Sequence, residues 1–153
     1  MSERLYFEDL PVGRRLRSGS HTVTAEEIVA FAAQYDPQPF HLDDAGAAGS
    51  LFQQLAASGW HTAAMTMRLQ VDGGLPVAGG IIGSRSDELR WPRPVRPGDT
   101  LHVETEVLEA RQSTSRSDQG WVKVRSTTVN QHGEPVQVLS VTLLVPCRPA
   151  PVP

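Results

Sequence analysis

The run DPQPFH over residues 36–41 places a carboxylate and an imidazole five positions apart on a proline-rich loop. A catalytic pair has to be held to within a fraction of an ångström, and the prolines of this run restrict its conformations before folding begins. Near neutral pH an imidazole accepts a proton, and a carboxylate beside it orients the ring and stabilises its charged form. Asp36 and His41 are therefore candidates for general acid–base catalysis, although such a pair can equally serve as a loop cap and a structural hydrogen bonder.

A second candidate group is the backbone at Ser58, Gly59 and Trp60, which opens an alanine-rich apolar segment. The first amides of a helix have no partner inside the helix and carry the positive end of its dipole, so they can hold a developing oxyanion. Glycine at position 59 leaves room for a carbonyl oxygen to approach closely. The alternative is a helix start capped by Ser58, with Gly59 present only for packing.

The helix that precedes the proline-rich loop is predicted over 24–35, because apolar residues recur at i, i+3, i+4 and i+7 from Ile28 onward. Thr24 and Glu27 have the spacing of a capping box, in which each side chain bonds the other residue's backbone amide. The loop over 36–44 is expected to be rigid and extended because of its prolines.

A second helix is predicted over 57–71, and its apolar residues occupy more than one face, which favours burial on most sides. From residue 79 the pattern changes to extended segments with alternating apolar residues, at 79–91, 99–111, 120–130 and 136–146. Runs of helix followed by runs of strand predict an α+β protein with an antiparallel sheet. A helix buried on most sides requires that sheet to curve around it.

Composition limits the class of protein further. The 153 residues fit one domain, which we place at 1–146, followed by a proline-rich tail at 147–153. The net charge of −3 speaks against nucleic acid as a partner. A single cysteine excludes a disulfide framework, and five scattered histidines without ligand spacing predict no metal site.

The N-terminal sequence and the hydropathy pattern predict where the protein resides. No apolar run approaches the roughly 18 residues of a membrane span. The N-terminus carries acidic residues and has no apolar stretch typical of a signal peptide. We therefore expect a soluble cytoplasmic protein with no membrane partner.

Three strings, FAAQYDPQPFHLDD, SGWHTAAM and RWPRPVRPGDTL, resemble the MaoC-like dehydratases and R-specific enoyl-CoA hydratases, and the resemblance covers about residues 6–146. It implies the hotdog fold, an antiparallel β-sheet wrapped around a central α-helix, in agreement with the predicted element order. Asp36 and His41 match the catalytic positions of the family's Asp-x-Asn-Pro-x-His motif, and Gly59 matches the glycine of its oxyanion hole. Gln38 departs from the motif, which usually has Asn there.

The resemblance also implies an activity, namely hydration of enoyl-CoA or dehydration of 3-hydroxyacyl-CoA, without a cofactor or metal. Asp36 and His41 would share a water molecule, and the Gly59 amide would stabilise the enolate-like oxygen. The residues expected to bind the acyl-CoA substrate are Gln38, Phe40, Ser58 and Trp60. A homodimer or higher homo-oligomer is expected as well, because a sheet with one helix on its concave face leaves other surfaces and edges to be covered.

Two other functions remain open at this point. The role of a cluster of arginines is open as well. A hotdog acyl-CoA thioesterase would use an acid to activate water against the thioester carbon. The other alternative is a non-catalytic acyl-CoA-binding subunit, in which Gln38 in place of the usual Asn marks a site that has lost its activity. The arginines near the proline-rich turn could bind the phosphates of CoA or belong to a solvated basic turn, and they are Arg90, Arg93 and Arg96.

Overall fold

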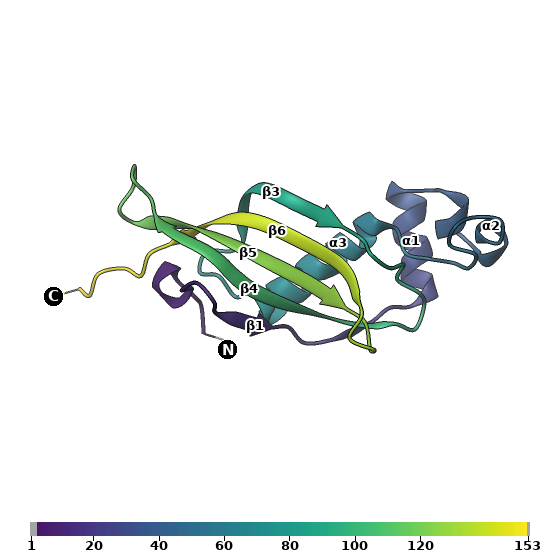
Figure 1. Ribbon diagram of the computed structural model, residues 1–153, viewed down its shortest axis with the longest axis horizontal. Helices are drawn as coiled ribbons and strands as arrows, with labels where there is room; N and C mark the ends of the chain where they lie inside the picture. Colours follow the sequence, from purple (N-terminus) through teal and green to yellow (C-terminus); the bar gives the residue numbers. More distant parts are fainter. Residues whose placement is uncertain (1–2, 153) are drawn as a thin grey trace.

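A curved antiparallel sheet forms the frame of the molecule in the computed structural model, which describes residues 3–152 (Figure 1). The ends of the predicted domain and tail, residues 1–2 and 153, lie outside the described residues. The strand order is β1-β4-β5-β6-β3, and β2 pairs with β4. The strands are β1 (Arg15–Arg17), β2 (His21–Thr22), β3 (Ile82–Arg90), β4 (Thr100–Gln112), β5 (Gln119–Val129) and β6 (Pro135–Pro146).

The four long strands confirm the extended segments predicted from residue 79 onward. Strand β3 begins at Ile82 rather than at 79, because Gly79 and Gly80 have φ angles of 77° and 102° and turn the chain first. Named strands pair antiparallel throughout, and irregular registers interrupt the pairing of β3 with β6, of β4 with β5 and of β5 with β6. Such irregularities increase the local twist and help the sheet to curve.

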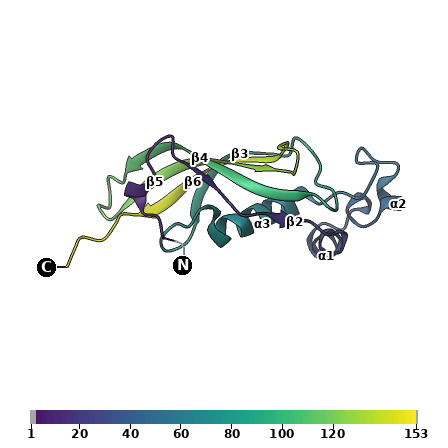
Figure 2. The same cartoon turned by 90° about the horizontal axis from the view of Figure 1, so that it is seen from below.

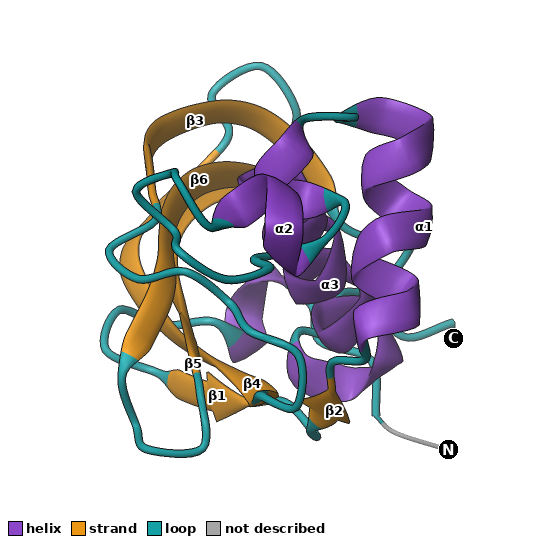
Figure 3. Ribbon diagram, turned by 90° about the vertical axis from the view of Figure 1, so that its right-hand side faces the viewer, coloured by secondary structure: helices purple, strands orange, loops and turns teal. Residues whose placement is uncertain are grey.

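Helix α3 (Gly59–Leu69) lies on the concave side of this sheet, as Figures 2 and 3 show. Helix α3 runs along the sheet, whereas α1 and α2 lie beyond one end of it. The α+β class and the antiparallel sheet around a central helix are thereby confirmed. The helical elements are η1 (Phe7–Asp9), α1 (Ala25–Tyr35), η2 (Pro39–His41), α2 (Asp44–Ala47), α3 (Gly59–Leu69) and η3 (Gln70–Gly74).

Helix α1 begins where the sequence predicts, and the Thr24 side chain accepts a hydrogen bond from the Glu27 amide at 3.2 Å. The reciprocal half of the predicted capping box is wrong. The Glu27 carboxylate instead accepts a hydrogen bond from Nε2 of His21 at 2.7 Å. Strand β2 holds His21 beside the start of α1, and the side chain of Glu27 turns toward this partner from another element.

The proline-rich loop is not extended throughout, in contrast to the prediction. Residues Pro39–His41 form a 3-10 turn, with Pro39 at its first position. Proline has a fixed φ that suits the first helical position and lacks the amide that would be unpaired there. This turn carries His41 back toward Asp36.

Helix α3 is buried on one side and exposed on the other, so the prediction of burial on most sides is wrong for a single chain. Trp60 and Met67 of α3 are 60% and 42% exposed, and Val71 in the η3 turn that follows is 56% exposed. The buried side meets the sheet partly through polar groups, since Thr66 Oγ1 lies 2.6 Å from the hydroxyl oxygen of Thr128 and Gln70 donates to Ser126. No helix among residues 3–152 is long and apolar enough to cross a membrane.

Candidate active site

The two predicted acid–base residues lie next to each other at the end of the molecule that carries α1 and α2. Asp36 caps the C-terminus of α1, and His41 ends the following 3-10 turn. Nε2 of His41 lies 3.5 Å from Oδ2 of Asp36. The turn at Pro39 therefore brings together two side chains that are separated by five positions in the sequence.

The imidazole of His41 is almost fully enclosed, with 4% of the residue exposed. Its Nδ1 lies 2.6 Å from the carbonyl oxygen of Ala56. A carbonyl oxygen can only accept, so Nδ1 donates this bond and carries the proton in the neutral ring. Nε2 then presents its lone pair toward Asp36, and a hydrogen bond fixed by the backbone sets the tautomer.

The carboxylate of Asp36 is oriented by two side chains. Ser58 donates its hydroxyl to Oδ2 at 2.7 Å, and Gln38 donates its amide to Oδ1 at 2.5 Å. Partial burial raises the pKa of Asp36, but these two bonds, together with the charge of His41 whenever its ring is protonated, outweigh it, so that the pKa lies below its ordinary value. Asp36 is therefore ionised at neutral pH.

The amide of Gly59 is the third element of the site. Gly59 is the first residue of α3, and the Ser58 hydroxyl accepts the amide of Trp60 at 3.3 Å, which confirms Ser58 as the helix cap. Among residues 3–152 the Gly59 amide finds no acceptor. A side chain at this position would collide with Trp91, whose ring carbons lie 2.6–2.8 Å from where a Cβ would stand.

A cavity of about 350 Å³ connects His41 with Gly59. Its walls are mostly apolar, and its lining residues are His41, Leu51, Phe52, Ala57, Gly59, Thr62, Trp91, Pro92, Arg93, Pro94 and Val95. Trp91 is fixed in this wall because its indole Nε1 donates to Gln137 at 2.9 Å, and Gln137 in turn donates to Thr66. The arrangement suits a ligand with an apolar chain and a polar group placed between an imidazole and a free amide.

None of the four residues predicted to bind substrate is in the lining of this cavity, and three of them contact the acid–base pair instead. Gln38 and Ser58 bind Asp36, and the Phe40 ring meets His41 edge-on with centroids 4.6 Å apart. Trp60 is largely exposed and packs edge-on against Trp91, with centroids 5.3 Å apart.

Sequence reasoning missed three large side chains in the cavity wall, namely Leu51, Phe52 and Trp91. A signal for the first two is present, because they are a pair of large apolar residues within a run of small and polar ones. Trp91 stands at the junction of a strand and a proline-rich turn, where an exposed aromatic residue has no evident core to join.

Within the described residues, the three arginines of the basic cluster are occupied by protein groups. Arg90 pairs with Glu88 at 3.5 Å and Arg93 with Glu134 at 2.9 Å. Arg96 donates to backbone carbonyls instead. These contacts favour the structural interpretation of the cluster.

Comparison with known proteins places these features in a family context. A family model described as MaoC like domain matches residues 8–130. The crystal structure of a MaoC-like dehydratase from Rhodospirillum rubrum has a TM-score of 0.93 and 56% sequence identity, covering 95% of this chain and 99% of that one.

Two further similar proteins are named for an activity. The R-hydratase PhaJ1 from Pseudomonas aeruginosa has a TM-score of 0.74 and 28% identity, covering 98% of this chain and 94% of that one. The 3-hydroxybutyryl-CoA dehydratase of Methylorubrum extorquens is 34% identical over 106 residues, which are 69% of this chain and 65% of the relative. These likenesses confirm the hotdog fold.

Proposed function

Since the chain belongs to the family of MaoC-like domains, which includes dehydratases and R-hydratases, we propose that it hydrates trans-2-enoyl-CoA and dehydrates 3-hydroxyacyl-CoA. The observation that carries this proposal is the placement of three groups at one end of the cavity. His41 and Gly59, whose amide is unpaired among residues 3–152, line the cavity, and the Asp36 carboxylate lies 3.5 Å from His41 Nε2.

The proposed reaction begins with a water molecule held by the acid–base pair. Neutral His41 Nε2 and Asp36 Oδ2 both accept hydrogen bonds, and 3.5 Å between them allows one water to donate to each. As the water oxygen bonds to C3 of the enoyl group, one of the two residues takes a proton. A proton is then delivered to C2, so that water is added across the double bond and no redox change occurs.

The Gly59 amide is proposed to stabilise the electron pair that moves from the double bond onto the thioester oxygen. An unpaired donor at a helix N-terminus is oriented before the reaction, so it needs no rearrangement when charge develops. Because this donor and the acid–base pair supply the electrostatic and proton-transfer steps, the proposal includes no metal or cofactor.

The contact made by Gln38 supports a working site over a decayed one. Its amide donates a hydrogen bond to Oδ1 of Asp36 and helps to orient that carboxylate. Gln, although longer than the usual Asn, therefore still supports the carboxylate. We therefore expect Gln38→Asn to retain hydration activity to within about tenfold, since Asn carries the same amide donor and the hydrogen bond to Asp36 is weakened rather than removed.

The test is incubation of the purified chain with crotonyl-CoA. Loss of the enoyl absorbance without release of free thiol is the expected result. Release of free thiol would assign a thioesterase instead. Binding without either change, on crotonyl-CoA and on longer enoyl chains, would assign a non-catalytic acyl-CoA-binding subunit.

We also propose that the chain acts as a homodimer. Trp60 and Met67 of α3 and Val71 of η3 are exposed apolar residues, and Ile82 on edge strand β3 is 54% exposed as well. An apolar helix face and an unpaired strand edge are both surfaces that a second copy can cover. Sedimentation should give twice the chain mass for the wild type and a single chain mass for Met67→Glu; a monomeric wild type would overturn the proposal.

A further inference from the structure

A short segment between α2 and α3, Ser50–Leu55, covers the imidazole of His41; we refer to it as the lid segment. The ring of Phe52 lies 5.6 Å from that of His41 and 5.1 Å from that of Phe40, measured between centroids. Leu51 stands beside it at the cavity, 94% exposed. The lid segment thus supplies part of the cavity wall and an aromatic neighbour for the His41 ring.

The backbone of the lid segment is held in an unfavourable turn. Gln53 has a φ of 64°, in the left-handed region that residues other than glycine rarely adopt. Its ends are tied down by the Ser50 hydroxyl, which accepts the Phe52 amide, and by Asp44, which accepts the Leu55 amide. A turn of this kind persists only when surrounding contacts hold it.

One side chain from the proline-rich turn before β4 binds the lid segment from outside, through three of its carbonyls. Arg96 donates Nη2 to the carbonyl of Phe52 and Nη1 to that of Gln54, both at 2.6 Å, and Nη1 reaches the Leu55 carbonyl at 3.4 Å. Within residues 3–152 its guanidinium forms no ion pair, unlike Arg90 and Arg93. Its charged, planar guanidinium instead donates hydrogen bonds to the carbonyls of a segment more than 40 positions away in the sequence.

We propose that Arg96 is a positioning residue for substrate binding, which acts by fixing the lid segment over the cavity; this rests on the proposed hydratase function. It acts through Leu51 and Phe52, which line the cavity. The tautomer of His41 depends less on it, because Ala56 is anchored separately by donating its amide to the carbonyl of Phe40 at 3.2 Å. Loss of Arg96 should therefore impair binding more than the chemical step.

The proposal is tested by steady-state kinetics of Arg96→Ala with crotonyl-CoA. We expect KM to rise about tenfold, as for loss of a charged hydrogen bond, while kcat changes by less than about threefold. Arg96→Lys keeps the charge but offers no planar fork to two carbonyls, so its KM should be intermediate. A fall in kcat with KM unchanged, in both variants, would overturn the proposal.

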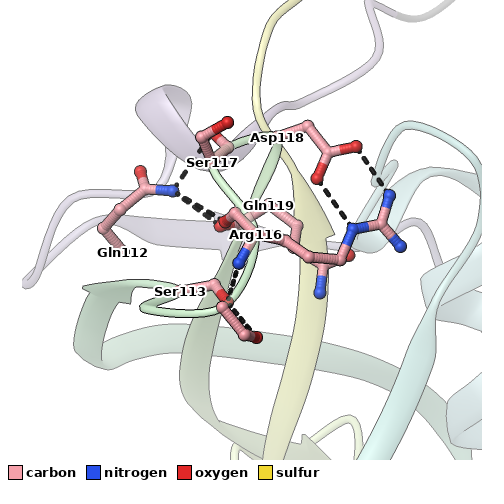
Figure 4. A network of polar contacts seen from close by, with 7 residues as sticks. Gln112, Ser113, Arg116, Ser117, Asp118 and Gln119 are labelled. Carbon is pink, nitrogen blue, oxygen red and sulfur yellow. Dashed lines mark hydrogen bonds and ion pairs between the residues drawn. The ribbon is translucent and has the colours of Figure 1, made fainter.

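A matched control lies at the opposite end of the molecule. Gln112 donates Nε2 to the carbonyls of Arg116, Ser117 and Gln119 and so closes the hairpin between β4 and β5 in the same manner (Figure 4). This hairpin is far from α2 and the lid segment (Figure 1). Gln112→Ala should leave both KM and kcat at the wild-type values.

Hydrogen exchange tests the positioning role independently of catalysis. Amides of the lid segment should exchange at least about tenfold faster in Arg96→Ala, and those of the hairpin should not change. Unchanged exchange in the lid segment, or equal acceleration across the whole chain, would overturn the proposal. If the wild type converts no enoyl-CoA, the proposed function fails by itself, and the affinity for butyryl-CoA still tests the positioning role: Arg96→Ala should bind it about tenfold more weakly, and equal affinity would overturn the proposal.

Discussion

Both ends of the molecule have a loop closed by one polar side chain, but only one of these loops lies beside the candidate active site. At one end Arg96 closes the lid segment through several carbonyls, and at the other Gln112 closes the β4–β5 hairpin in the same way. Each end also has a glycine packed against an aromatic ring, Gly59 against Trp91 and Gly120 against Phe7. Similar local contacts therefore serve both a candidate site and an ordinary turn.

The difference lies in the burial of charge. In the hairpin Arg116 and Asp118 form an ion pair whose side chains are 61% and 64% exposed, and such pairs contribute little to stability. At the other end the Asp36 carboxylate is half-buried, receives two hydrogen bonds and faces an enclosed imidazole. A closed loop therefore does not by itself mark a functional site. Titratable groups held away from solvent next to an unpaired amide are the more specific sign.

The largest expected difference between the two ends comes from their aspartates. Asp36→Asn keeps the shape of the side chain but removes the charge that stabilises a protonated His41. General acid–base groups contribute about 10²–10⁴-fold, so kcat for hydration should fall by that factor. Asp118→Asn should leave kcat unchanged, and the loss of crotonyl-CoA absorbance measures both.

His41→Ala provides the internal control for this prediction. It should be about as damaging as Asp36→Asn, and the double variant should be little worse than the poorer single one, because the pair acts as a unit. Near-full activity in both single variants would contradict the assignment and leave the loop with a structural role only.

The two glycines give the second contrast. In Gly59→Ala the new Cβ would meet the Trp91 ring and push it or α3 away, so the proposed oxyanion donor would be misplaced. Loss of one such donor costs about 10²–10³ in kcat. Gly120→Ala meets Phe7 and should lower the free energy of unfolding by about 1–3 kcal/mol through overpacking, with kcat unchanged.

Measurement of kcat together with urea unfolding separates the two glycine effects. Gly49→Ala is a further control, since a Cβ there meets nothing within 4 Å. If Gly59→Ala were to lose stability alone, with kcat retained, Gly59 would be a packing residue like Gly120.

Much of the fold was predictable because it depends on local periodicity. The start of α1 at Thr24, the cap of α3 at Ser58 and the long strands all follow from short-range patterns. Contacts between distant elements were not predictable in this way. Glu27 bonds His21 instead of its own helix because β2 pairs with β4, which the sequence near Glu27 does not indicate.

The candidate site divides in the same manner. Asp36, His41 and Gly59 were predicted as site residues from residue type and spacing together with the family resemblance, and they stay predictions. The lid segment was not identified, because its closure depends on Arg96, whose side chain meets it only after the sheet and α3 have assembled. The exposed side of α3 was missed for a related reason, since apolar residues on several faces do not reveal what covers each face.

A smaller effect on kcat is expected when the serines that accept backbone amides at the two ends of the molecule are replaced. Ser58 and Ser113 each accept a backbone amide, but Ser58 also donates to Asp36. Ser58→Ala should lower kcat roughly tenfold, as for loss of one hydrogen bond to a charged group. It should also lower the free energy of unfolding by about 1 kcal/mol through loss of the cap. Ser113→Ala should leave kcat unchanged.

The pH dependence of Ser58→Ala gives a sharper test. The pKa of Asp36 is below its ordinary value in the folded chain, partly because of the Ser58 bond, so this carboxylate stabilises the fold above its unfolded pKa. That stabilisation disappears as the pH falls through the folded pKa. Removing the bond raises the folded pKa, so the acid limb of kcat/KM should move to higher pH. An acid limb identical to that of the wild type would contradict the link between Ser58 and Asp36.

The smallest expected effect concerns the independence of the two ends. Arg96→Ala and Gln112→Ala remove similar loop-closing contacts that share no partner and lie at opposite ends of the sheet (Figure 1). Gln112→Ala should lower the free energy of unfolding by less than about 1 kcal/mol, because water can replace an exposed amide at the hairpin carbonyls. In the double variant the two losses should add to within about 0.5 kcal/mol in urea unfolding, as for distant sites. A larger deviation would mean that the sheet transmits strain between the lid segment and the hairpin, and the two ends could then no longer be treated as separate devices.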